Sequence, residues 1–369
     1  MKSEIAIVGG GLAGLVSSVI LAKKGLEVLV IEKKTYPFHR VCGEYISNET
    51  LDFLRLHNLL PDYLELPDIR TFEFSDTAGD RVRIPLDLGG FGVSRYVLDE
   101  WMYRQAQKAG VQFITGVQVD EIDFLEKEDC FSLSLSDHRQ IHSNYVFGAF
   151  GKRSKLDKKL SRPFIEKRSP YLGVKYHIRT DFVKDTVALH NFSGGYCGLN
   201  AIEGDKFNLC YLGSRDQLRD HGSIEAMERE VLWKNPILKK IWTESEFLFE
   251  KPEVISEINF EPKKPVENHI LMAGDSAGLI TPLCGNGMAM AIHAGLLAAE
   301  ALIHGKSRLE KEQIYETSWS SEFETRLWVG RQVQRLFGSG KTSRFARRLI
   351  QHVPPVARFI IKNTHGQPF

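Results

Sequence analysis

The sequence has little of what marks several protein classes. Its five cysteines are scattered and include no CxxC pair, so neither a disulfide framework nor a structural zinc site is expected, and the compartment is predicted to be reducing. The net charge is only +1, which argues against nucleic acid as a partner. The twelve histidines show no metal spacing such as HExxH, and no metal site is predicted.

Long apolar runs are also scarce. The apolar N-terminal stretch contains Glu4 and several glycines, which is not typical of a signal peptide. No other stretch reaches the ~20 apolar residues that a membrane span requires. We therefore expect a cytoplasmic protein. The 369 residues are too many for one small core and predict two domains, or a nucleotide-binding domain with large insertions.

A βαβ unit is predicted at the start of the chain. The pattern indicates a strand at 4–8, a helix at 12–24 that Gly25 closes, and a second strand at 28–31. The turn between the first strand and the helix reads Gly-Gly-Gly-Leu-Ala-Gly, which satisfies G-x-G-x-x-G in the context that the motif requires. A parallel sheet follows from this arrangement.

Each glycine of this turn has a distinct expected role. Gly9 permits the tight turn, Gly11 lets the backbone approach a pyrophosphate, and Gly14 lets the helix pack on the sheet. The free N–H groups at the helix N-terminus stabilise phosphate charge. Glu32, at the end of the second strand, is expected to accept both ribose hydroxyls and to repel a 2′-phosphate. The dinucleotide-binding residues predicted here are Gly9, Gly11, Leu12, Ala13, Gly14, Glu32 and Lys33.

A second motif follows a predicted strand at 270–273. It reads Ala-Gly-Asp-Ser-Ala-Gly, then Pro-Leu-Cys-Gly-Asn-Gly before a helix predicted at 287–303. Asp275 is expected to bond a ribityl hydroxyl, and the nearby amides are expected to face a flavin pyrimidine edge, where they would stabilise negative charge. The predicted flavin contacts are Gly274, Asp275, Gly285, Asn286, Gly287 and Met288. Together the two motifs predict FAD as the cofactor.

In this order and at this separation, the motifs resemble those of FAD-dependent oxidoreductases of the p-hydroxybenzoate hydroxylase-like superfamily. The similarity covers roughly residues 4–301. The superfamily includes group A flavin monooxygenases, flavin-dependent halogenases and geranylgeranyl reductases. The resemblance implies an α/β fold, in which a Rossmann-like FAD-binding domain carries an inserted antiparallel β-sheet substrate domain and a helical C-terminal tail.

Domain boundaries follow from this resemblance. We expect residues 1–160 and 262–308 to form the FAD-binding domain, with a hairpin at 69–86 that contributes to the substrate side. Residues 161–261 are expected to form the substrate domain, and residues 309–369 the helical C-terminal region.

Shorter matches favour the geranylgeranyl reductase branch. Arg40-Val41-Cys42-Gly43-Glu44 resembles the Cys-Gly segment that this branch places beside the flavin ring. Residues 93–99 resemble the superfamily segment whose arginine, here Arg95, lies against the FAD. The resemblance implies cofactor contacts for Arg40, Cys42, Gly43 and Arg95. Two roles stay open for Cys42: a catalytic one, by redox chemistry or substrate contact, and simple packing near the flavin.

The substrate pocket is expected where the substrate sheet faces the flavin. Residues 194–196 and 208–210 resemble the substrate-sheet segment of the geranylgeranyl reductases, although Gly198, Leu199, Asn200 and Ala201 replace its tryptophan and Phe-Pro. The predicted pocket residues are apolar or aromatic: Tyr171, Phe192, Tyr196, Leu199 and Leu209.

Three functions are compatible with these residues. The first is a reductase or dehydrogenase that acts on a carbon–carbon bond of an apolar substrate, such as an isoprenoid, a lipid or a polyketide-like molecule. The second is a monooxygenase that hydroxylates such a substrate with O₂ and NAD(P)H. The third is a FAD-binding protein without turnover. In the first two, NAD(P)H or another reductant serves as a transient electron donor.

The C-terminal region is basic. From Gly330 onward it contains no Asp or Glu and eight basic residues: Arg331, Arg335, Lys341, Arg344, Arg347, Arg348, Arg358 and Lys362. Apolar residues alternate with these charges. The composition suits an amphipathic helix in peripheral contact with an anionic membrane, and it equally suits a helix that packs its apolar side on the protein. Both alternatives stay open.

Overall fold

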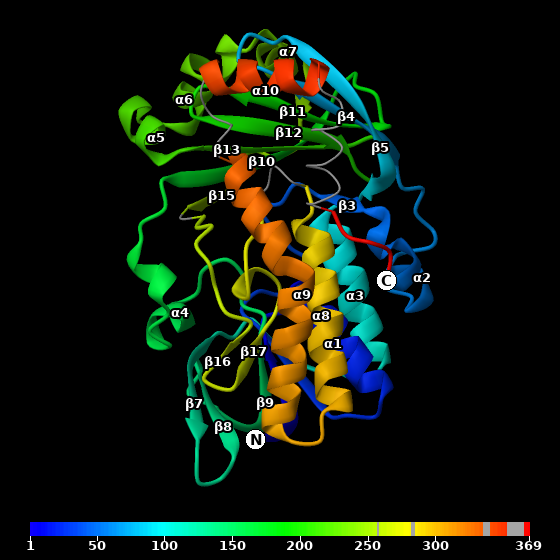
Figure 1. Ribbon diagram of the computed structural model, residues 1–369, viewed down its shortest axis with the longest axis vertical. Helices are drawn as coiled ribbons and strands as arrows, with labels where there is room; N and C mark the ends of the chain where they lie inside the picture. The colour runs from blue at the N-terminus through cyan, green and yellow to red at the C-terminus, as the bar shows by residue number, and fades with distance from the viewer. Residues whose placement is uncertain (257, 282–284, 335–339, 353–364) are drawn as a thin grey trace.

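A computed structural model describes residues 1–256, 258–281, 285–334, 340–352 and 365–369. The chain builds two β-sheets, with a stack of long helices beside the first and shorter helices over the second (Figure 1).

The first sheet has the strand order β16-β17-β9-β1-β2-β6. β1 pairs in parallel with both β2 and β9, and β17 also pairs in parallel with β9. A hairpin of β7 and β8 extends the sheet from β9. The strands are β1 (Lys2–Val8), β2 (Val28–Glu32), β6 (Gln112–Thr115), β7 (Val119–Leu125), β8 (Cys130–Leu135), β9 (Gln140–Gly148), β16 (Val266–Glu267) and β17 (Ile270–Met272).

Four helices form the stack beside this sheet: α1 (Leu12–Lys23), α3 (Arg95–Lys108), α8 (Gly287–His304) and α9 (Arg308–Gln334). α1 packs on both α3 and α8, and α9 packs on α8 (Figure 1). Within the described ranges, α8 is the one helix long and apolar enough to cross a membrane, but 61% of it is buried inside the protein. Such burial is typical of a core helix.

The second sheet has the order β14-β10-β13-β12-β11-β4-β5-β3, with β15 paired to β10. The N-terminal hairpin β4–β5 joins it through β11. That pairing is parallel, whereas the other pairs among the described strands of this sheet are antiparallel. The strands are β3 (Tyr45–Ser47), β4 (Asp68–Ser75), β5 (Arg81–Gly92), β10 (Tyr171–Arg179), β11 (Thr186–Phe192), β12 (Gly195–Ala201), β13 (Phe207–Ser214), β14 (Glu246–Phe247) and β15 (Glu253–Ser256).

The helices between β13 and β14, which cover the second sheet, are short and interrupted. They are α5 (Arg215–His221), α6 (Ile224–Glu230), the 3-10 turn η3 (Leu232–Lys234) and α7 (Pro236–Glu244). The interruption between η3 and α7 lies at Pro236, which lacks a backbone N–H. The Asn235 side chain accepts a bond from Ile237 N at 2.9 Å and so begins α7.

The remaining elements connect the sheets or cover them. They are the 3-10 turns η1 (Asn48–Thr50), η2 (Pro163–Glu166) and η4 (Gly274–Ser276), and the helices α2 (Leu51–Leu56), α4 (Lys155–Lys159) and α10 (Gly340–His352). α10 contacts β4 and β5 and lies over the second sheet (Figure 1). The predicted α/β architecture, with a second, largely antiparallel sheet and a helical C-terminal region, is confirmed.

Candidate active site

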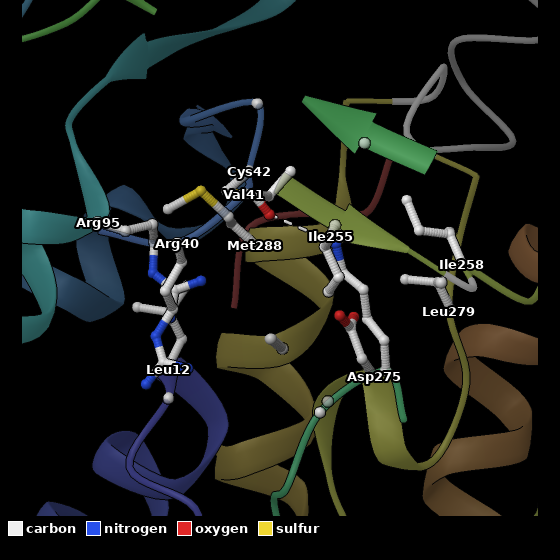
Figure 2. Close-up of a pocket in the computed structure, with 18 of the residues that line it drawn as sticks. Leu12, Arg40, Val41, Cys42, Arg95, Ile255, Ile258, Asp275, Leu279 and Met288 are labelled. Carbon is white, nitrogen blue, oxygen red and sulfur yellow. Dashed lines mark hydrogen bonds between the residues drawn. The ribbon is translucent and has the colours of Figure 1, made fainter. Parts of the chain in front are cut away.

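A cavity of about 960 Å³ lies between the two sheets, a size typical of cofactor and substrate sites. Figure 2 shows Leu12, Arg40 and Arg95 on one side of it and Asp275 and Leu279 on the other. Most of the predicted site residues line this cavity: Gly9, Gly11, Leu12, Ala13, Glu32, Lys33, Arg40, Cys42, Gly43, Arg95, Tyr196, Gly274, Asp275, Gly285, Gly287 and Met288.

At Gly9 and Gly14 the glycine-rich turn leaves no room for a side chain, because other backbone atoms approach closely. Gly9 has φ +109°, and a Cβ there would lie 2.2 Å from the Ala149 carbonyl oxygen. A Cβ on Gly14 would lie 2.1 Å from the Gly9 oxygen, so Gly14 faces the turn instead of the cavity. At Gly11 a Cβ would meet the Arg95 guanidinium at 3.6 Å, an ordinary contact distance. The first turn of α1 therefore approaches the cavity with its N–H groups uncovered by a capping side chain.

Glu32 is held rigidly at the end of β2. Its Oε2 accepts bonds from Gly10 N at 2.9 Å and from Arg40 Nη2 at 3.1 Å. Its Oε1 accepts from Lys34 N at 3.0 Å. A carboxylate offers about four acceptor positions, so this oriented, buried side chain can still accept bonds from a ligand in the cavity.

Asp99 joins the two arginines of the site. Its carboxylate accepts from Arg40 Nε at 2.9 Å and from Arg95 through two bonds of 2.6 and 2.8 Å. Asp99 was not among the predicted site residues. The i, i+4 spacing of Arg95 and Asp99 at the start of α3 is the signal that would have indicated it.

The Cys42 loop, residues 40–44, rests on a buried charge cluster. Glu44 is fully buried, and its carboxylate accepts from Lys175 Nζ, from Arg95 N at 2.7 Å and from His177 Nε2 at 2.7 Å. Burial alone would raise the pKa of Glu44, but the Lys175 cation and the His177 ring outweigh it and lower the pKa to about 2. Glu44 is therefore ionised at neutral pH.

The second motif closes the opposite side of the cavity. Asp275 lies in η4 with its backbone oxygen bonded by Lys263 Nζ at 2.7 Å. The Ser276 hydroxyl accepts from Gly151 N at 2.9 Å, which ties η4 to the loop after β9. Asn286 is buried and does not line the cavity. Residues 282–284 of this motif, which include Cys284, lie outside the described residues.

Besides Arg40 and Arg95, six lysine and arginine residues of the described ranges line the cavity. They come from the segment after β2 and from the segment that enters α4: Lys33, Lys34, Lys152, Arg153, Lys155 and Lys158. Lys152 Nζ donates a hydrogen bond to the Val41 carbonyl at 3.4 Å. This charge favours an anionic ligand group such as a pyrophosphate.

The rest of the lining is apolar. We call the following cluster the apolar wall: Phe74, Leu189, Tyr196, Leu212, Ile258, Leu279 and Ala346. It draws on β4, β11, β12, β13 and α10. The hairpin β4–β5 contributes more of the lining than the sequence suggested, through Phe72, Phe74, Ile84 and Leu86.

The structure differs from the predicted pocket at four of its five positions. Phe192, Leu199 and Leu209 lie on the other face of the second sheet, in a core shared with Met227 of α6 and Leu238 of α7. Successive strand residues point to opposite faces, so Tyr196 faces the cavity while Leu199 faces away. Tyr171 packs beside the apolar wall, 5.7 Å from the Phe260 ring, without lining the cavity. Residues two apart along β12 share a face, so this spacing in the sequence would have separated the cavity-facing residues from the core residues.

The described residues contain no cluster of three or more His, Cys, Asp or Glu side chains that could hold a metal ion. Cys42, Cys130, Cys197 and Cys210 carry free thiols. Burial raises the pKa of the Cys210 thiol, which also lines the cavity, to about 12.

A glycine-rich strand–helix turn, an oriented acid on the next strand and an aspartate across the same cavity define a dinucleotide-binding oxidoreductase that uses FAD. The chain belongs to the family described as FAD binding domain, whose model matches residues 2–307. The resemblance inferred from the motifs is thereby confirmed, as are FAD as the cofactor and the enzyme class.

Individual relatives are distant. A digeranylgeranylglycerophospholipid reductase from Methanosarcina acetivorans is 25% identical over 339 residues, which cover 86% of this chain and 80% of the relative. A geranylgeranyl bacteriochlorophyll reductase-like protein from Thermoplasma acidophilum has a TM-score of 0.78 at 18% identity and covers 98% of this chain and 96% of its own. A probable FAD-dependent monooxygenase from Pseudomonas aeruginosa has a TM-score of 0.72 at 15% identity, covering 93% and 98%. Similarities between structures at this identity show the fold alone.

Proposed function

We propose that this protein reduces or dehydrogenates a carbon–carbon bond of an apolar substrate, such as an isoprenoid, a lipid or a polyketide-like molecule. The observation that carries the proposal is the apolar wall, which lines the same cavity as the Cys42 loop and the predicted FAD residues. Such a wall can bury hydrocarbon but offers little to orient a polar substrate. The reductase among the relatives points the same way.

The residues present fit FAD. The α1 N-terminus and Gly11 would hold the pyrophosphate, Glu32 the ribose hydroxyls and Asp275 the ribityl chain, because these groups line one continuous cavity. Bound FAD supplies two-electron chemistry at its isoalloxazine ring. The chain's own task is to place a substrate bond against that ring and to exclude water from it.

The protein surroundings of the substrate are set by a few side chains. Arg95 and Cys42 both line the cavity among the predicted cofactor contacts. The apolar wall keeps water out of the same cavity, which strengthens electrostatic interactions inside the site. NAD(P)H or another reductant is proposed to reload the cofactor, and the basic side chains near Lys33 and Lys155 suit its phosphate groups.

An anaerobic experiment separates the candidate functions. The flavin is reduced with NADH, NADPH or dithionite, oxygen is excluded, and an isoprenoid with an allylic double bond is added. Reoxidation of the flavin with loss of the double bond is the expected result. Turnover that requires oxygen and yields a hydroxylated product would establish the monooxygenase instead. Flavin that no apolar substrate affects under either condition would leave a binding protein without turnover.

A further inference from the structure

The carbonyl groups of the Cys42 loop are held by donors from outside the loop. Lys175 Nζ bonds the Arg40 oxygen at 3.1 Å, and Lys152 Nζ bonds the Val41 oxygen at 3.4 Å. The Asn208 amide bonds the oxygens of Cys42 at 3.2 Å and Gly43 at 2.8 Å. The Glu44 oxygen accepts from Val93 N at 3.2 Å and from the Asn200 amide at 3.5 Å. The second sheet therefore holds the loop at Arg40, Cys42, Gly43 and Glu44, and Lys152, which follows β9, holds it at Val41.

Three of these donors come from one face of the second sheet. Lys175 on β10, Asn208 on β13 and Asn200 on β12 are fully or almost fully buried. In β10, Lys175 and His177 alternate with the apolar residues Val174 and Tyr176, which pack into the core on the other face. The polar face of β10 is thus directed at the Cys42 loop, and its charge is matched by Glu44.

Buried ionic groups of this kind are costly. A well-packed apolar pair in place of a buried ion pair is often neutral or stabilising, so stability alone does not account for Lys175 and Glu44. Glu44 lines the cavity, has φ +53°, and also holds the backbone N–H of Arg95. The Lys175–Glu44 pair therefore contacts both features of this region that are predicted to meet the cofactor, namely the Cys42 loop and Arg95.

We propose that Lys175 is a positioning residue that acts through Glu44: it holds the Cys42 loop and Arg95 against the flavin and cancels a negative charge that would otherwise stand beside it. This inference rests on the proposed FAD site. It assigns to the second sheet a role in setting the redox properties of a cofactor that the first sheet binds.

The test uses two variants that change the local charge in opposite directions. Lys175→Met leaves the Glu44 carboxylate uncompensated, which should disfavour reduced, electron-rich flavin. Glu44→Gln leaves the Lys175 cation, which should favour it. At a fixed solution potential, the ratio of reduced to oxidised flavin should fall roughly tenfold in the first variant and rise roughly tenfold in the second, as expected for a unit charge ~10 Å away at an effective dielectric of ~20. Dye-coupled potentiometry on the FAD-loaded proteins measures both ratios.

Controls separate this role from a structural one. Lys184→Met removes an exposed lysine, paired with Asp205, from the same domain and should leave the ratio unchanged. The double variant Glu44→Gln/Lys175→Met should return toward the wild-type ratio. Glu44→Gln is close to isosteric, so if Lys175→Met does not fold, this variant alone must raise the ratio or the proposal is wrong. The proposal is also wrong if both single variants shift the ratio of reduced to oxidised flavin in the same direction, or if flavin that stays bound shows no change in this ratio. A wild-type protein that binds no FAD would instead refute the proposed function.

Discussion

Arg347 of α10 donates a hydrogen bond from Nε to the Asp76 carboxylate at 2.9 Å, although 271 positions separate the two residues. Asp76 is fully buried in the turn of the β4–β5 hairpin, and Arg347 also lies 3.4 Å from Asp80. The neighbouring residues Ala346 and Leu349 line the cavity. One side of the cavity is therefore closed by a helix that an ion pair fixes to the hairpin.

Arg347→Gln should loosen α10. Asp76 keeps its bonds from Ala78 N and Asp80 N but loses its cation, which should cost about 1–3 kcal/mol of unfolding free energy. Limited proteolysis at α10 should accelerate. Arg70→Gln, which removes an exposed pair with Asp68, is the matched control and should leave both quantities unchanged. Equal proteolysis of the Arg347 variant and wild type would show that the ion pair does not hold the helix.

Peripheral membrane contact through the basic C-terminal region remains a proposal. On α10, Phe345 is 59% exposed and Arg348 is exposed, whereas Arg335, Arg358 and Lys362 lie outside the described residues. We expect co-sedimentation with anionic but not neutral vesicles, weakening above ~0.3 M salt. Phe345→Ser should reduce it, and Leu56→Ser, at an 80% exposed position on α2, should not. Indifference to anionic vesicles at low salt would leave α10 a packing role alone.

Asp275→Ala should fold and lose FAD affinity. Loss of one charge-assisted hydrogen bond costs roughly 1.5–3 kcal/mol, or roughly 10- to 150-fold in Kd. Fluorescence titration of the flavin-free protein measures the loss. Asp275→Asn, which keeps an acceptor oxygen, should recover part of it. Native affinity and native flavin absorbance in the alanine variant would remove Asp275 from the cofactor site.

The two faces of the second sheet predict different outcomes for two leucines. Leu189 lies in the apolar wall, whereas Leu199, on the adjacent strand, packs toward α6 and α7. Leu189→Ala should raise KM for an apolar substrate. Leu199→Ala should cost about 2–5 kcal/mol of stability and leave KM unchanged. Steady-state kinetics and denaturant unfolding test the pair, and the reverse pattern would assign the substrate to the other face.

Acid should destabilise the protein before its carboxylates titrate. Burial lowers the pKa of His190 from the usual 6.5 to about 4. Between these values the unfolded chain binds a proton that the folded protein rejects, so this contribution is complete above pH ~6.5 and is lost as pH falls toward ~4. It amounts to at most about 3 kcal/mol. In His190→Gln, the free energy of unfolding measured with denaturant should fall less steeply with decreasing pH than in wild type. In His138→Asn, at an exposed position, this pH dependence should match that of wild type.

Local patterns in the sequence predicted much of the first sheet. The strand at β1, the helix that begins at Leu12 and the left-handed Gly25 after it follow from hydrophobic periodicity and from glycine's freedom at positive φ. The two motifs indicated a cofactor site because each carries its backbone requirements within a few residues. These features can therefore be predicted without knowledge of the rest of the fold.

The substrate side was predicted less well, and the reason is physical. Which face of β12 meets the cavity depends on register with β11 and β13 and on the helices that cover the other face. A one-residue change of register exchanges the two faces, and composition alone does not fix it. Phe192, Leu199 and Leu209 were apolar enough for either side.

The sequence by itself thus determined the FAD-binding fold and most of the motif residues that line the cavity, because their chemistry is encoded in short segments. Only the tertiary structure decided which residues of the second sheet and α10 line the same cavity. Lys175 meets Glu44 across 131 positions, and Arg347 meets Asp76 across 271. Such ion pairs leave no mark on local periodicity, since each charged residue alone is typical of a solvated surface. Packing of β10 against the Cys42 loop, and of α10 against the β4–β5 hairpin, brings these pairs together and buries them.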